Sequence, residues 1–221
     1  MASSTPAGMP ISPLLRLPIE LRYTIYGLLC EPSFLYYPYP NSPITSISLQ
    51  APPRQLLLIC KQVLSEVRSH FYGLATFRFA ALGSSKIDRN DLSVGTISAL
   101  QEVRKAELIL SWNLNGKRRE AGGIEFWPFS MNGWLVDTVS LLEEYSGNLE
   151  CVIVTLHDAS RFTDWELKRG MLEPLKALKN CGNGEKRVRF EMGQCRLHPD
   201  DTRREIEKHL TAYVAELNQR E

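Results

Sequence analysis

The sequence has no excess of charge of either sign, since 26 lysines and arginines stand against 25 aspartates and glutamates in a chain of 221 residues. This balance argues against bulk electrostatic attraction to nucleic acid or to an acidic membrane surface. No apolar stretch approaches the ~20 residues of a membrane span, and the start, MASSTPAGMPIS, has neither a basic segment nor an apolar run. We therefore expect no secretory signal, no membrane partner and an intracellular location, in the cytoplasm or the nucleus.

Cysteine is sparse and irregularly placed. The five cysteines include no Cys-x-x-Cys motif and most stand among apolar residues, so we expect free buried thiols rather than a disulfide framework. Cys181, Cys195 and His198 offer three ligands that suit zinc, but the sequence suggests no fourth. The prediction is therefore that the protein holds no metal and no cofactor.

Motifs of known catalytic chemistry are also missing: there is no G-x-S-x-G, G-x-x-x-x-G-K-[ST], G-x-G-x-x-G or H-E-x-x-H. The best enzymatic candidate is His157 with Asp158, because they end the clearest predicted strand and α/β sheets bind ligands at strand carboxyl ends. The alternative for this pair is a structural role in a turn. Basic residues at 117–119 and 186–189 are diluted by acids, which favours solvated loops over nucleic-acid contact. We expect a protein that is not an enzyme.

The first third of the chain is predicted to contain a pair of helices. Residues 1–13 are rich in Ser, Pro, Gly and Ala and should form a tail. A helix should begin at Pro18, and its apolar stripe should consist of Leu17, Leu21, Ile25 and Leu28. A second helix is expected over 54–73, stopped by Gly73, with a buried face of Leu56, Ile59, Cys60, Val63, Val67 and Phe71.

Residues 33–53, between the two helices, are rich in proline and tyrosine. Proline excludes a regular helix here, so we predict a surface loop. Tyr36, Tyr37 and Tyr39 in this loop are either a surface that binds a partner, since aromatic side chains are common in binding hot spots, or a cover for the helical pair. After the second helix, TFRFAA at 76–81 alternates as a strand does, with Phe77 and Phe79 on one face.

The rest of the chain alternates helix and strand. We expect helices over 92–103 with Asp91 as cap, 130–146, 164–182 with a bend or a fresh start near Pro174, and 199–221. Strands are expected over 103–112, 124–127, 149–158 and 186–193. The inward residues should be Trp134, Leu135, Leu141 and Leu142 in one helix and Ile206, Leu210, Val214 and Leu217 in the last. The apolar run at 149–158 suggests a strand covered on both faces.

This alternation predicts parallel strands joined by right-handed crossovers. The predicted fold class is α/β, with α+β as the alternative: a helical pair (14–81) packed on a small, mainly parallel sheet with crossover helices (82–221), in one continuous body. Strands recur about every 40 residues, too far apart for a regular leucine-rich repeat, so the layer would be only loosely similar to one.

The most specific feature is a Glu-x-Arg triplet in each N-terminal helix, Glu20 to Arg22 and Glu66 to Arg68. Residues i and i+2 of a helix point about 200° apart, so no triplet can pair within itself. Within each helix, the glutamate instead borders one margin of the apolar stripe and the arginine borders the other. This predicts pairing between the helices, Glu66 with Arg22, Glu20 with Arg68, or both. The alternatives are capping of backbone groups elsewhere and solvated surface charges.

The segments LLRLPIELRYTIYGLL and LLLICKQVLSEVRSHFYGLATFRF, which carry these triplets, resemble the fungal two-EXR domain family. The similarity covers residues 16–80. Members of that family have an F-box-like N-terminus, and F-boxes dock on the SKP-type adaptor of cullin ubiquitin ligases. The chain differs from an F-box in its insertion at 33–53 and in EVRSHFY, which stands where the late F-box tryptophan region would be.

The resemblance implies a protein-interaction module, with the helical pair as an F-box-like adaptor element and Pro18 at the start of its docking helix. The alternative is that the pair only packs on the α/β part of the chain. A second hypothesis, from another class, is a small α/β enzyme or ligand-binding protein with its site near His157 and Asp158.

Overall fold

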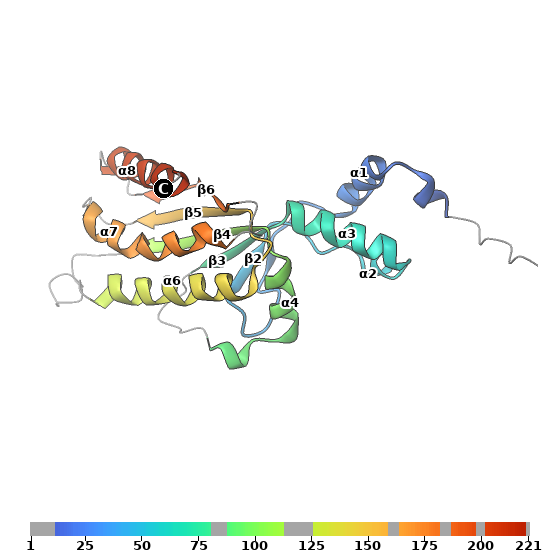
Figure 1. The fold of residues 1–221 in the computed structure, drawn as a ribbon, viewed down its shortest axis with the longest axis horizontal. Coiled ribbons are helices and arrows are strands. Elements are labelled where there is room, and N and C mark those ends of the chain that lie inside the picture. Colours follow the sequence, from blue (N-terminus) through green and yellow to red (C-terminus); the bar gives the residue numbers. More distant parts are fainter. Residues whose placement is uncertain are drawn as a thin grey trace, which may run out of the picture.

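The computed structural model describes residues 12–80, 88–112, 126–158, 164–181, 187–197 and 202–219, with only the backbone at 126–130 and 202. They form a mixed seven-stranded sheet with helices along it, and a group of N-terminal helices that projects beyond one end of the sheet (Figure 1). The chain is an α/β protein, as the predicted alternation indicated. None of the helices described has the length and hydropathy needed to cross a membrane. Of the predicted tail, only residues 12 and 13 are described.

The N-terminal helices, which we call the helical unit, are the 3-10 helix η1 (Pro13–Arg16), α1 (Ile19–Leu29), α2 (Arg54–Leu57) and α3 (Lys61–Leu74). The prediction of one helix over 54–73 is wrong, because the chain leaves the helix at 58–60 and Cys60 then caps α3 by accepting a hydrogen bond from the N–H of Val63. Ile59 and Cys60 stand in this break and are therefore exposed rather than buried. Gly73 does not end α3, which continues to Leu74.

The helical unit has a small core of its own, made of Tyr26, Leu56, Val63 and Val67. The end of α3 joins the main core through Phe71 and Ala75, and so does Cys30, the C-cap of α1. The unit is thus attached to the sheet by α3 and extends away from it (Figure 1). The predicted helical pair thus packs on the sheet through α3, and α1 packs on α3.

The sheet has the strand order β1-β2-β3-β4-β5-β6, and β7 lies beside the end of β5. Strands β3 to β6 are parallel to one another, and β1 and β2 are antiparallel to their neighbours. The bounds are β1 (Leu35–Tyr36), β2 (Ile44–Ile47), β3 (Thr76–Ala80), β4 (Lys105–Trp112), β5 (Cys151–Asp158), β6 (Arg189–Met192) and β7 (Arg196–Leu197).

Strands β1 and β2 lie in the segment predicted as a surface loop. They were missed because both are short and the prolines around them hide the alternation. Ile44 and Ile47 of β2 are buried in the main core, so this segment extends the sheet rather than lying over it.

One face of the parallel strands is covered by helices. Since strand order follows chain order from β3 to β6, right-handed crossovers place the connecting helices on the same side. Leu108 and Val154 share a core with Leu135 and Leu172 of that helical layer, and we call this the helix face. The layer contains α4 (Val94–Glu102), α6 (Phe126–Tyr145), α7 (Trp165–Leu172), the 3-10 helix η3 (Glu173–Asn180) and α8 (Thr202–Asn218), and the short 3-10 helix η2 (Arg89–Asp91) precedes α4.

The opposite face carries the alternate residues of each strand. In β4 the residues Lys105, Glu107, Ile109 and Ser111 are half-buried, while their neighbours are fully buried. The prediction that β5 is covered on both faces is wrong for Ile153 and His157, which are half-buried on this side. We call this surface the opposite face.

The helical predictions are otherwise largely confirmed. The eight residues predicted to point inward in α6 and α8 are all buried. A fresh start near Pro174 is confirmed by η3, which begins at Glu173. Asp91 does not cap α4; the hydroxyl of Ser93 does, by accepting from the N–H of Thr96. The strand predicted at 124–127 is wrong, since Phe126 begins α6.

Candidate functional site

Arg22 and Glu66 join the two long helices of the helical unit. The guanidinium donates from Nε to Oε2 and from Nη2 to Oε1, both at 2.8 Å. The two side chains are only 9% and 11% exposed. A fork of this kind fixes orientation as well as distance. The predicted pairing of Glu66 with Arg22 is therefore present.

Other groups converge on the same pair. Tyr26 donates its hydroxyl to Glu66 at 3.0 Å, and Gln62 donates its amide at 2.9 Å. Arg22 also donates from Nη1 to the carbonyl oxygen of Leu17, in the segment before α1. Hydrogen bonding from Arg22 lowers the pKa of Glu66, and burial together with the bond to Glu66 raises the pKa of Tyr26 to about 12. The cluster holds α1 on α3 through polar atoms; it is a structural device, with no reacting group free in it.

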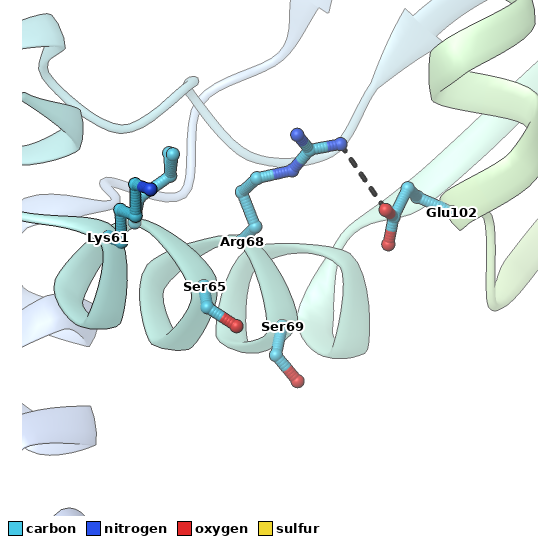
Figure 2. Close-up of a pocket in the computed structure, with 6 residues that line it drawn as sticks. Lys61, Ser65, Arg68, Ser69 and Glu102 are labelled. Atoms are coloured by element: carbon cyan, nitrogen blue, oxygen red, sulfur yellow. Dashed lines mark hydrogen bonds and ion pairs between the residues drawn. The ribbon is translucent and has the colours of Figure 1, made fainter.

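The second predicted pair does not form. Arg68 donates to Glu102 at the end of α4, at 3.2 Å, and Glu20 lies exposed in the first turn of α1. Arg68 and Glu102 belong to an open groove of about 290 Å³ that is also lined by Lys61, Leu64, Ser65 and Ser69. Figure 2 shows that the hydroxyls of Ser65 and Ser69 point away from Arg68. The two hydroxyls and the Arg68–Glu102 pair therefore do not point to a common centre.

The apolar stripe of α1 faces outward. Leu21 and Leu28 are 51% and 78% exposed, whereas the buried positions of the helix are Arg22 and Tyr26. The prediction that this stripe packs on the second helix is wrong. The reason is that the polar contacts of Arg22 and Tyr26 with Glu66 turn these two residues toward α3, and they lie about 100° round the helix from Leu21 and Ile25. We call Leu21, Ile25 and Leu28 the outer face of α1.

Exposed apolar residues are concentrated in the N-terminal part of the chain. Most of the large apolar side chains that are exposed among the described residues lie between positions 19 and 59: Ile19, Leu21, Leu28, Leu29, Phe34, Leu35, Tyr36, Tyr37, Leu58 and Ile59. Pro18 is also exposed, as the N-cap of α1. A contiguous apolar surface marks an interaction site more often than single exposed residues do, and Leu21, Ile25 and Leu28 follow one another along one face of α1.

The three tyrosines of the insertion have different roles. Tyr36 and Tyr37 are 66% and 68% exposed. Tyr39 is half-buried and packs against the main core, beside Gly95 of α4. Tyr39 thus packs on the α/β body and is also hydrogen-bonded with Tyr72 of α3, so it covers the end of the helical pair that adjoins the sheet.

His157 and Asp158 do not form a joint site, because successive residues of a strand point to opposite faces. Asp158 lies fully buried on the helix face, where one of its carboxylate oxygens is 3.0 Å from Nζ of Lys168 on α7. The Lys168 ammonium stands 5.0 Å from the centre of the Trp112 ring. His157 lies on the opposite face, where burial and the charge of Arg196 lower its pKa.

Sequence reasoning missed Lys168. A signal exists, since Lys168 shares a helical face with the apolar residues Trp165, Met171 and Leu172. A buried lysine needs an acidic partner inside the protein, and here that partner is Asp158, the last residue of β5.

The remaining candidates lie partly outside the described residues. This applies to the basic residues 117–119, to Lys186 and to His198 of the considered zinc ligands. In the described part of the chain, no three or more His, Cys, Asp and Glu side chains gather in a way that could hold a metal ion. Arg189, from the second basic cluster, forms an exposed ion pair with Glu191 at 2.6 Å.

Comparison with known proteins returns nothing: no family model matches the chain, and no curated protein and no solved structure matches it.

Proposed function

We propose that this protein is an intracellular interaction module that is not an enzyme, and that its helical unit docks on the SKP-type adaptor of cullin ubiquitin ligases. The partner is the one that the similarity to two-EXR proteins implies. The observation that carries the proposal is the outer face of α1, where Leu21 and Leu28 remain exposed in a well-formed helix.

The spacing of this face suits a helix that docks in a groove. Leu21, Ile25 and Leu28 stand at positions i, i+4 and i+7, which is how amphipathic helices present apolar anchors to a partner. Burial of such side chains contributes about 25 cal/mol per Å² of apolar surface removed from water.

The helix is also held ready for docking. Arg22 and Tyr26 bind Glu66 on the side of α1 that faces α3, so the outer face does not need to be reoriented before a partner binds. Affinity is gained when a binding element is already ordered in its bound orientation.

The test is calorimetric titration of the full chain with a purified fungal SKP-type adaptor. We expect binding in the micromolar range or tighter, and weakening by at least about tenfold in Leu28→Asp, since a carboxylate would enter the apolar interface. Leu167→Asp is the matched control, because Leu167 of α7 is 50% exposed and lies on the α/β body. Absence of binding by the unmodified chain, or equal weakening in both variants, would overturn the proposal.

A further inference from the structure

Three side chains from three neighbouring strands form a row on the opposite face of the sheet. Ser111 of β4 is in register with His157 of β5, and His157 is in register with Arg196 of β7. In a parallel sheet, partners in register point to the same side, about 4.8 Å apart. The row lies at the carboxyl ends of β4 and β5, the edge of an α/β sheet where ligands bind.

The three groups are complementary to an oxyanion. A serine hydroxyl, an imidazole and a guanidinium can all donate hydrogen bonds to the same group of oxygens, and the guanidinium does so with two parallel N–H groups. Ser111 and His157 are half-buried, which limits competition from water, and Arg196 is exposed at the outer end of the row.

The acid nearest to the row is already engaged. Glu107 lies on the same face and accepts hydrogen bonds from Arg78 at 2.5 Å and from Thr155 at 2.8 Å. Asp158 is on the helix face with Lys168. The other charged side chains that the described strands place on the opposite face are Lys105 and the paired Arg189 and Glu191. Among the strand residues that the structure describes, no unpaired acid therefore neutralises the charge of Arg196.

The electrostatics of His157 agree with this arrangement. Burial and the charge of Arg196 lower its pKa, while the charge of Glu107 acts in the opposite direction. The neutral form of the imidazole is favoured for this reason. An anion bound between His157 and Arg196 would stabilise the protonated imidazole, so anion binding and proton uptake should be coupled.

We propose that His157 and Arg196 form a binding site for a phosphate-class oxyanion, such as the phosphate group of a small phosphate ester, with Ser111 at its border. Arg196 binds two oxygens, and His157 donates to a third position after taking up a proton. Asp158, which adjoins His157 in the sequence, has no part in this site.

The test uses inorganic phosphate and inorganic sulfate as probes, with the full chain and with sodium chloride at matched ionic strength. The pKa of His157 is followed by NMR of its imidazole. We expect each anion to raise this pKa, and sulfate to bind at least about tenfold more weakly at pH 8 than at pH 5.5, because the charge of sulfate itself does not change over that range.

Variants distinguish binding of the anion at this site from nonspecific electrostatic attraction of anions to the protein. Arg196→Gln should lose the effect of both anions on His157, and His157→Asn should bind sulfate more weakly and without dependence on pH. The matched control is Arg189→Gln, on the same face but at the start of β6, which should behave as the unmodified chain does. A His157 pKa that phosphate leaves unchanged, or an equal loss in Arg189→Gln, would overturn the proposal. Circular dichroism of each variant establishes that it is folded.

Discussion

The carboxylate of Glu66 on α3 receives both arms of a guanidinium fork from Arg22 on α1, 44 residues earlier in the chain. Because Tyr26 donates to the same carboxylate, two successive turns of α1 are fixed by polar contacts with one residue. The apolar residues of α1 are left on the other side of the helix. The charged triplets therefore determine which face of α1 is available to a partner.

Removal of the fork should destabilise the helical unit. Arg22→Ala would leave the Glu66 carboxylate largely buried without its cation, so the free energy of unfolding should fall clearly. Arg68→Ala is the control: its ion pair with Glu102 is exposed, and such pairs contribute about 0–1 kcal/mol. Urea unfolding followed by circular dichroism measures both. A double-mutant cycle between Arg22 and Glu66 should show coupling, and similar losses for the two arginine variants would contradict this role.

The same pair predicts a dependence on acid pH. The pKa of Glu66 in the folded protein lies below its ordinary value of 4.5, chiefly because Arg22 hydrogen-bonds the charged form. Its contribution to stability is thus present above that value and is lost as the pH falls through the folded pKa, since the unfolded state then binds more protons. Stability measured between pH 6 and pH 3 should fall less steeply in Glu66→Gln. Identical slopes in the two proteins would show that Glu66 does not contribute.

Sequence patterns predicted best those elements whose apolar period matches a single buried side. Strand β4 and helix α8 are of this kind: both were predicted and are present, and the predicted inward residues of α8 are buried. The apolar stripe of α1 has the same periodicity but is exposed rather than buried. Periodicity identifies which residues share a helix face, but it does not show whether another element covers that face. The direction was decided by hydrogen bonds from Arg22 and Tyr26, which no hydrophobic pattern contains.

Prediction of the candidate sites from sequence patterns was limited in the same way. The chemical types at His157 and Asp158 were recognised, but strand geometry separates the two side chains onto opposite faces. Their real neighbours, Arg196 and Lys168, are 39 and 10 residues away along the chain and are brought close by strand register and by helix packing. Contacts of that range depend on topology, and short motifs cannot supply them.

The buried pair of Lys168 and Asp158 should respond strongly to the loss of one member. Lys168→Met would remove the cation that faces a fully buried carboxylate, at a cost of about 3–5 kcal/mol in the free energy of unfolding. Lys168→Met combined with Asp158→Leu should regain much of this loss, since two apolar side chains leave no buried charge. His157→Gln is the neighbouring control on the opposite face and should change stability far less. Chemical denaturation of the unmodified chain and the three variants measures these differences. A double variant no more stable than Lys168→Met would contradict the pairing.

Gly193 and Gly170 make a matched pair for testing the close approach of β6 to β5. A Cβ atom at Gly193 would lie 1.9 Å from Oγ1 of Thr155, the side chain that donates to Glu107, whereas no atom lies within 4 Å of a Cβ at Gly170. Gly193→Ala should therefore cost about 1–3 kcal/mol by overpacking. Gly170→Ala, inside α7, should be neutral or stabilising by up to about 1 kcal/mol, because alanine favours the helix.

A second substitution shows whether the clash with Thr155 is the cause. Thr155→Ala removes the atom that the new Cβ would meet, so the cost of Gly193→Ala should be smaller in that background than in the unmodified chain. Thermal unfolding of the single and double variants gives the coupling. If Gly193→Ala costs the same in both backgrounds, the contact with Thr155 is not what requires glycine at this position.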